Sequence, residues 1–112
     1  MDKKVIKVKS VEEWDTVLRE SGDKLIVANF RESNTQSSDK MAPVFRDMSE
    51  TYEDVTFIEL DSEEVNALFY EYDIIDTPTF VVFRDGENVG QVLGTNHSIL
   101  NRTIDKHYSN PN

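Results

Sequence analysis

The sequence predicts a single α/β domain with a mixed central sheet, and three observations support this fold class. Apolar residues recur at strand or helix spacing along most of the chain, in the order β-α-β-α-β-α-β-β-α. Strands separated by helices are typical of parallel crossovers, whereas the last two strands are separated only by a hairpin turn. A length of 112 residues suits one domain with its own core. We therefore expect a single domain over residues 1–109 and a disordered tail over 110–112.

The N-terminal third predicts a short strand, a helix and a buried strand. The short strand covers residues 5–8. Ser10 and Glu13 then have the spacing of a capping box at the start of a helix, and Gly22 is placed to end that helix. Residues 25–30 form a nearly continuous apolar run, so we expect a central strand that is covered on both faces.

The middle of the chain predicts a polar loop, a helix, a strand and a second helix. Residues 31–40 are wholly polar, which is typical of an exposed loop leading into a helix. Apolar residues follow at helical spacing over 41–52, where Pro43 should either start a segment or kink the helix. A strand over 56–60 and a helix over 65–72 come next.

The C-terminal third predicts a hairpin and a last helix. Residues 79–83 are rich in β-forming side chains, and the Asp-Gly pair at 85–86 is a strong signal of a tight turn. Residues 88–93 form the returning strand, in which Gly90 is a candidate bulge. Ser98 opens the last helix. The residues expected to face inward from this helix are Ile99, Leu100, Thr103 and Ile104.

The formal net charge of −10 and the pI near 4.5 exclude several kinds of partner. Such a surface repels the phosphates of nucleic acids and the headgroups of anionic membranes, so we expect neither as a partner. The carboxylates look scattered, as on a solubilising surface. The cluster formed by Asp61, Glu63 and Glu64 is better explained by helix capping than by a metal site.

The chain contains no cysteine, and this removes several chemistries at once. Without a thiol there is no disulfide, no thiolate nucleophile and no cysteine ligand for zinc or an iron–sulfur cluster. His97 and His107 do not have the spacing of metal ligands. We therefore expect no metal, no cofactor and no enzymatic activity. No apolar run approaches the ~20 residues that span a bilayer, and no signal-peptide pattern follows Met1, so we expect a cytoplasmic protein.

Four segments carry a resemblance to the thioredoxin family that extends over residues 5–107. Residues 40–45 resemble the stretch that follows the redox motif of that family, and residues 74–80 resemble its cis-proline segment. Residues 83–87 resemble its hairpin, and residues 92–94 resemble the glycine segment beside its active site. The resemblance implies the thioredoxin fold, which is a three-layer α/β/α arrangement of four helices around a mixed five-stranded sheet.

The same resemblance indicates that the redox chemistry of the family is missing. The two catalytic cysteines correspond to Thr35 and Ser38, the tryptophan to Asn34, and the buried aspartate that transfers protons to Asn29. A hydroxyl group cannot form a redox couple, and an amide does not titrate. We therefore interpret Thr35 and Ser38 as helix-capping residues, and Asn29 as a hydrogen-bonded amide of the core.

A peptide-binding groove is the part of the family's site that does not depend on sulfur. The resemblance implies a cis peptide bond between Thr77 and Pro78, which in the family leaves the preceding backbone free to pair with an extended substrate. The residues expected to form this groove are Asn34, Thr35, Gln36, Ser37, Asp76, Thr77, Pro78, Gly94 and Thr95.

Three functions are compatible with these residues. The first is a redox-inactive thioredoxin-like protein that acts as an interaction module or chaperone-like factor, with a protein or extended, basic peptide as its partner. The second is a cysteine-free engineered or diverged form of a disulfide oxidoreductase. The third is a glutathione-handling enzyme in which the hydroxyl of Thr35 or Ser38 steadies a bound thiolate. We favour the first because Asn29 and Asn34 depart from the family as well as the two cysteine positions.

Overall fold

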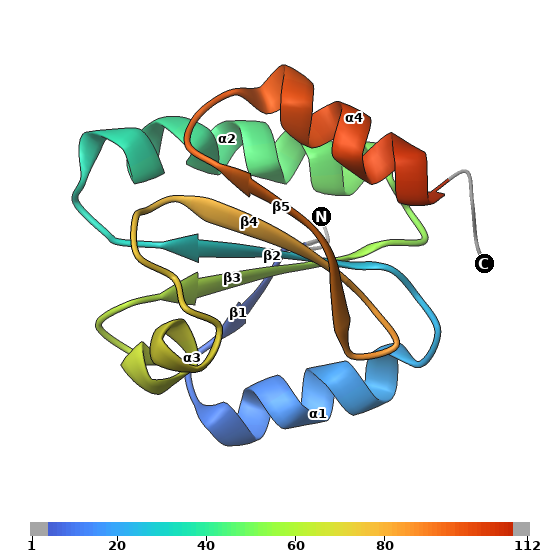
Figure 1. Ribbon diagram of the computed structural model, residues 1–112, viewed down its shortest axis with the longest axis horizontal. Coiled ribbons are helices and arrows are strands. Elements are labelled where there is room, and N and C mark those ends of the chain that lie inside the picture. Colours follow the sequence, from blue (N-terminus) through green and yellow to red (C-terminus); the bar gives the residue numbers. More distant parts are fainter. Residues whose placement is uncertain (1–4, 109–112) are drawn as a thin grey trace.

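A computed structural model describes residues 5–108, and the predicted tail over 110–112 lies outside them. The strands are β1 (Val5–Val8), β2 (Ile26–Arg31), β3 (Thr56–Asp61), β4 (Thr79–Arg84) and β5 (Glu87–Leu93). The helices are α1 (Val11–Ser21), α2 (Gln36–Thr51), α3 (Asn66–Glu71) and α4 (His97–Tyr108). These elements follow one another in the predicted order (Figure 1).

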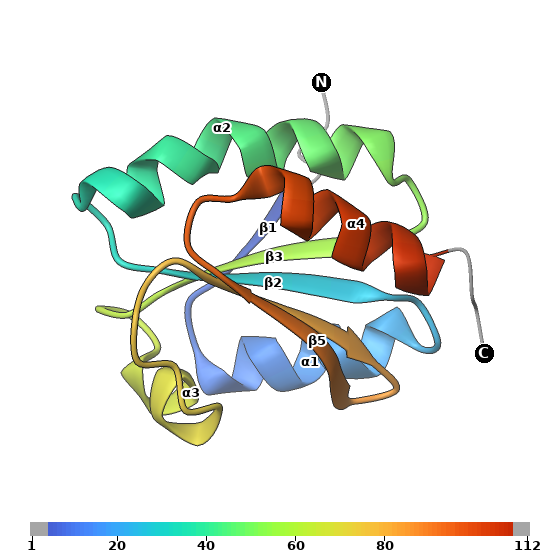
Figure 2. The same ribbon diagram turned by 45° about the horizontal axis from the view of Figure 1, so that its top comes forward.

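The five strands form one mixed sheet in the order β1-β3-β2-β4-β5. Strands β1 and β2 pair with β3 in parallel, whereas β4 runs antiparallel to β2 and β5 runs antiparallel to β4. Helices α2 and α4 lie on one face of the sheet and α1 and α3 on the other (Figures 1 and 2). The predicted three-layer α/β/α fold is therefore confirmed. Within residues 5–108, no helix has the length and apolar character needed to cross a bilayer.

Strand β2 separates two hydrophobic cores, one under each helical layer. Its residues from Ile26 to Phe30 are all buried, as predicted for a strand covered on both faces. The core beneath α1 and α3 centres on Trp14, whose ring lies edge-on to Phe30 and Phe83 at centroid distances of 6.3 and 5.6 Å. The Trp14 indole N–H donates to the Tyr72 hydroxyl at 3.2 Å. Burial raises the pKa of that hydroxyl above its ordinary value, which keeps it protonated.

The core beneath α2 and α4 is rich in phenylalanine. Phe45 of α2 lies 5.1 Å from Phe57 of β3 and 5.6 Å from Phe80 of β4, measured between ring centroids. Leu100 and Ile104 of α4 complete this core and are fully buried, as predicted. These contacts hold the middle of α2 against the sheet.

Helix α2 begins earlier than the sequence predicted. It starts at Gln36, ahead of Met41, and it runs through Pro43 rather than starting there. Only residues 32–35 remain as a loop, so the expected long exposed loop is wrong. A polar run can form the first turns of a helix when most of its side chains point to solvent, and here only Ser38 is fully buried.

Local signals at the first helix and at the hairpin act as predicted. The backbone N–H of Glu13 donates to the Ser10 hydroxyl at 3.1 Å, although the Glu13 carboxylate accepts from the N–H of Lys9 rather than that of Ser10. Asp85 and Gly86 both have positive φ, 53° and 82°, as a two-residue hairpin turn requires.

The close packing of α4 on β5 requires a glycine at position 90. The β4–β5 register shifts beside it, and a Cβ at Gly90 would lie 2.9 Å from the Cγ2 of Thr103. The bulge expected near Gly90 is therefore confirmed, and the small side chain lets the helix approach the strand. Ile99, which was expected to face inward, is instead 41% exposed because the neighbouring Leu100 occupies the inner face at that turn.

Candidate functional site

Two segments that are far apart in the sequence meet at one end of the sheet, the edge formed by the carboxyl ends of the parallel strands β2 and β3. The Ser37 hydroxyl in the first turn of α2 donates to the carbonyl oxygen of Thr77 at 3.2 Å. The backbone N–H of Gly94 donates to the carbonyl oxygen of Pro78 at 2.9 Å, which adds a third segment. Figures 1 and 2 show the loops before α2, β4 and α4 on this same side of the sheet.

The predicted groove residues all lie on these segments. The Thr77–Pro78 peptide bond is cis, as the resemblance implies, and Pro78 is buried. The exposed residues are Asn34, Gln36 and Asp76, and the half-buried residues are Thr35, Ser37, Thr77, Gly94 and Thr95. The structure therefore places the whole predicted set at one edge of the sheet, and peptide binding by this set stays a prediction.

The hydroxyls of Thr35 and Ser38 hold the loop before α2 rather than capping the helix. Thr35 has the extended backbone of a capping residue, but its hydroxyl donates to the carbonyl of Glu32 at 2.6 Å. The Ser38 hydroxyl accepts from the backbone N–H of Glu32 at 3.1 Å. The predicted capping role of both side chains is therefore wrong. Both hydroxyls form hydrogen bonds with the main chain of Glu32, in the loop before α2, and not with the free N–H groups of the helix.

Asn29 departs most from its prediction. It is fully buried in β2, between Glu59 of β3 and Phe80 of β4 in the strand register. It shares a sheet face with Val27, two residues away, and that face packs under α2. Within residues 5–108 neither its amide oxygen nor its amide nitrogen has a hydrogen-bond partner. The expected hydrogen-bonded core amide is therefore wrong, although the carboxylate residue Glu59 lies beside Asn29 in the strand register.

Arg31, at the end of β2, connects α2 and β3 through ion pairs, and the sequence analysis did not single it out. Its guanidinium lies 2.5 Å from the carboxylate of Asp39 and 3.2 Å from that of Glu59, and these are the ion pairs present within residues 5–108. The Ser33 hydroxyl also donates to the carboxylate of Asp61. A lone cation at the end of an apolar strand was the available signal, since polar groups gather at the carboxyl ends of parallel strands.

An open, charged cleft of about 250 Å³ adjoins this loop on its β1 side. The residues lining it are Lys7, Lys9, Ser33, Glu59, Asp61, Glu63 and Glu64. The Asp61 carboxylate accepts from the backbone N–H of Glu63 at 3.0 Å, and α3 begins only at Asn66. Asp61 therefore stabilises the turn before α3, which corrects its predicted role at the helix start itself. No group of histidine and carboxylate side chains in the described part of the chain is arranged to hold a metal ion.

Comparison with known proteins shows to which family the chain belongs. Residues 5–106 match the family model described as thioredoxin. The chain belongs to the thioredoxin family. Thioredoxin-2 of Saccharomyces cerevisiae is 31% identical over 100 residues, which cover 89% of this chain and 95% of the yeast protein. The crystal structure of thioredoxin NaTrxh from Nicotiana alata has a TM-score of 0.90 at 30% identity, covering 96% of this chain and 95% of that one.

Some thioredoxin relatives are much longer than this chain. Thioredoxin domain-containing protein 2 of Mus musculus is 33% identical over 97 residues, which cover 87% of this chain but only 19% of the mouse protein. The corresponding protein of Rattus norvegicus is 32% identical, and the match covers 18% of it. The chain therefore spans about a fifth of the length of these two relatives.

Within the thioredoxin family, this chain lacks the reactive groups of the redox site. It contains no cysteine, so the thiol groups of the family's redox site are missing, and the correspondence of Thr35 and Ser38 to the redox cysteines stays a prediction. Disulfide exchange requires a thiolate that attacks a sulfur atom, and a hydroxyl cannot replace it. The chain therefore does not carry out redox catalysis by the mechanism usual in thioredoxins.

The Ser38→Ala variant should lower the free energy of unfolding by about 1–2 kcal/mol, because it leaves the Glu32 N–H without its acceptor in a part-buried position. The Thr35→Ala variant is the matched control. Its hydroxyl is half-buried and donates to a carbonyl that water can also reach, so its effect should be smaller. Urea denaturation of both variants measures the difference. Equal losses would show that burial of Ser38 is not what makes its hydrogen bond important.

Proposed function

We propose that this chain is a redox-inactive thioredoxin-like protein that binds a protein or extended peptide, as an interaction module or chaperone-like factor, and is not an enzyme. The observation that carries the proposal is the hydrogen bonding of the hydroxyl groups of residues 35–38. Thr35 and Ser38 are both engaged with the main chain of Glu32, whereas Ser37 supports the Thr77–Pro78 segment. The segment that we expect to correspond to the redox motif contacts the cis-proline segment and carries no thiol.

The backbone beside Pro78 offers a hydrogen-bond acceptor to an extended segment. Addition of a peptide to an exposed backbone uses main-chain hydrogen bonds and needs no sulfur. The carbonyl oxygen of Thr77 accepts from Ser37, and a carbonyl has a second lone pair that can accept a peptide N–H. The groove rim is polar, since Asn34, Gln36 and Asp76 are exposed, so the partner should present polar side chains.

The hydrogen bonds of Thr35 and Ser38 also count against the glutathione-handling alternative. A hydroxyl that steadies a thiolate must donate its proton to the ligand. The Thr35 hydroxyl already donates to Glu32, and Ser38 is fully buried. A cysteine-free form of an active oxidoreductase would need only the two cysteine positions changed, whereas Asn29 has also lost the titratable group. Neither alternative has an observation in its favour.

A groove-blocking variant tests the proposed function. Random 12-residue peptides displayed on phage are selected on the full chain, and the enriched peptides are synthesised with a fluorescent label. The Gln36→Trp substitution places bulk on an exposed residue of the first turn of α2 and should weaken their binding about tenfold or more. Glu50→Trp, on an exposed residue near the other end of α2, is the matched control and should bind like the unmodified chain.

Fluorescence anisotropy of the labelled peptides measures both variants. Equal binding by Gln36→Trp and Glu50→Trp would move the interface away from the groove, and a selection without enrichment would contradict peptide binding altogether. Gly94 is not used for the blocking substitution, because its φ of +95° would strain any side chain placed there.

A further inference from the structure

The negative charge of the chain is concentrated in one continuous stretch. From Asp47 to Phe83 the sequence contains eleven aspartate and glutamate residues and no lysine, arginine or histidine. The rest of the chain carries eleven carboxylates and twelve lysine and arginine residues, so it is close to neutral. The carboxylates are therefore not scattered as the sequence analysis expected. This stretch, which includes α3 and the loops on both sides of it, therefore has a formal charge of −11, and the rest of the chain has +1.

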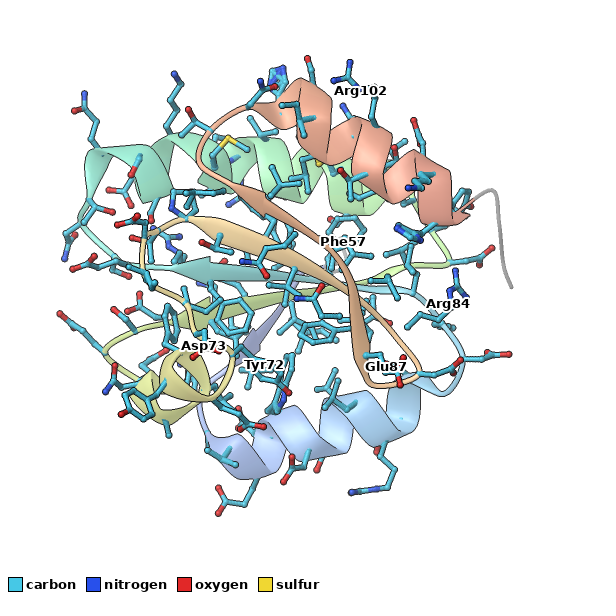
Figure 3. All side chains as sticks on the ribbon, in the orientation of Figure 1. Phe57, Tyr72, Asp73, Arg84, Glu87 and Arg102 are labelled. Carbon is cyan, nitrogen blue, oxygen red and sulfur yellow. The ribbon has the colours of Figure 1, made fainter. Side chains whose placement is uncertain are left out.

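The carboxylates at the C-terminal end of α3 are exposed and have no cation beside them. Glu71, Asp73 and Asp76 take part in no ion pair within residues 5–108, where the cation of both pairs is Arg31. Figure 3 shows Asp73 on this side of the molecule, next to Tyr72. The carboxylates before α3 differ in this respect, since Lys7 and Lys9 line the same cleft as they do. The C-terminal end of α3 therefore carries exposed negative charge that no ion pair within residues 5–108 compensates.

Two apolar side chains stand among these carboxylates. Tyr70 is 87% exposed and Ile75 is 89% exposed, the highest values of any large apolar side chain within residues 5–108. The backbone that carries them is well held: the N–H of Ile74 donates to the carbonyl of Phe69 at 2.8 Å, and the N–H of Asp73 donates to the carbonyl of Tyr70 at 3.2 Å. Tyr70 and Ile75 are therefore exposed on a segment whose backbone is held in place by hydrogen bonds at the end of α3.

We propose that Tyr70, Glu71, Asp73 and Ile75, named here the α3 platform, dock a basic protein segment in which lysine or arginine residues flank an apolar side chain. The apolar residue of the partner would cover Tyr70 and Ile75, and its cations would neutralise Glu71 and Asp73. The same charge disfavours the other occupants. A second copy of this chain would bring two acidic platforms together, and nucleic acids and anionic membranes are repelled.

This inference deepens the proposed binding function by naming the chemistry of the partner. The α3 platform lies next to the groove, since Ile75 is followed by Asp76 and Thr77. Glu32, whose carboxylate accepts from the Thr77 hydroxyl at 3.4 Å, extends the negative potential toward the groove. A basic segment docked on the platform would therefore continue directly into the groove.

Three labelled nine-residue peptides test the platform with the full chain. The first alternates lysine and arginine around a central leucine, the second has serine in place of that leucine, and the third has glutamate in place of every cation. Fluorescence anisotropy should show binding of the first peptide, weaker binding of the second and none of the third. Binding of the first should also fall when the ionic strength rises from about 50 to about 300 mM, because salt screens exposed charges. Equal binding of the first two peptides would overturn the apolar contact, and failure of the first to bind would overturn the inference.

Matched variants separate the platform from the groove. Tyr70→Ser/Ile75→Ser should weaken binding of the leucine peptide about tenfold or more, whereas Ile99→Ser, on α4, should not. Glu71→Gln/Asp73→Asn should weaken it and flatten its salt dependence, and asparagine tolerates the φ of +56° at position 73. Glu53→Gln/Asp54→Asn, a change of equal charge at two exposed residues after α2, is the control.

The groove variant Gln36→Trp completes this experiment. Loss of binding in Gln36→Trp with no loss in the platform variants would overturn the platform and leave the groove function intact. Loss in the platform variants with no loss in Gln36→Trp would support the platform and contradict the groove as the binding site. Loss in both sets would support one continuous surface. All the substituted platform residues are exposed, so the variants should fold, which circular dichroism checks.

Discussion

The Thr35→Cys/Ser38→Cys variant should reduce insulin disulfides only slowly in the presence of dithiothreitol, and the unmodified chain should not accelerate that reaction at all. The two positions lie in the right places for a dithiol, since Thr35 is half-buried at the start of α2 and Ser38 is buried in its first turn. The N-terminus of α2 favours the thiolate form of a cysteine placed there. Proton transfer, however, would lack a partner, because the amide of Asn29 does not titrate.

Adding Asn29→Asp to those two substitutions should raise the rate of insulin reduction about 10²-fold, which is the lower end of what a positioned acid or base contributes. The single variant Ser38→Cys is the control, since one buried thiol cannot complete a dithiol cycle. Insulin turbidity and the oxidation of dithiothreitol measure the rate. If the two cysteine substitutions alone gave the rate of the triple variant, Asn29 would not be the missing group. Acceleration by the unmodified chain would contradict the redox-inactive function.

The Asn29→Val variant should raise the free energy of unfolding by roughly 1–3 kcal/mol, because it removes a buried polar group that makes no hydrogen bond within residues 5–108. Valine is close in size to asparagine and favours strands, so β2 should accept it without repacking. The Asn29→Asp variant should lose stability at neutral pH, since an ionised carboxylate is expensive to bury without a partner.

Urea denaturation of both Asn29 variants measures these changes, and the midpoint should move in opposite directions for the two. Val27→Ala is a useful reference on the same face of β2. It removes buried apolar contacts and should destabilise the chain by about 1–3 kcal/mol. A loss of stability in Asn29→Val would show that the amide is hydrogen-bonded in solution and does hold the sheet to α2.

The candidate surface combines two parts with different physical origins. The groove depends on hydrogen bonds between distant segments, such as that between Ser37 and Thr77. The α3 platform depends on charge and exposure in one local segment. A partner that uses both parts would gain specificity from the backbone and a faster, salt-sensitive encounter from the carboxylates.

The sequence by itself determined the order of the elements, the mixed sheet and the absence of thiol chemistry. Each of these depends on local information: the apolar run of 25–30, the Asp-Gly turn and a count of cysteines. The capping of α1 by Ser10 is equally local, since donor and acceptor lie three residues apart. The concentration of charge from Asp47 to Phe83 was also present in the sequence.

Only the tertiary structure decided what the polar residues around the former redox motif do. Thr35 and Ser38 were expected to cap α2, and they instead form hydrogen bonds with the main chain of Glu32, in the loop before the helix. Asn29 was expected to find a hydrogen-bond partner, yet its amide has none within residues 5–108, although Glu59 lies beside it in the strand register. A polar side chain takes whichever partner the fold brings within about 3 Å, and sequence spacing does not contain that information.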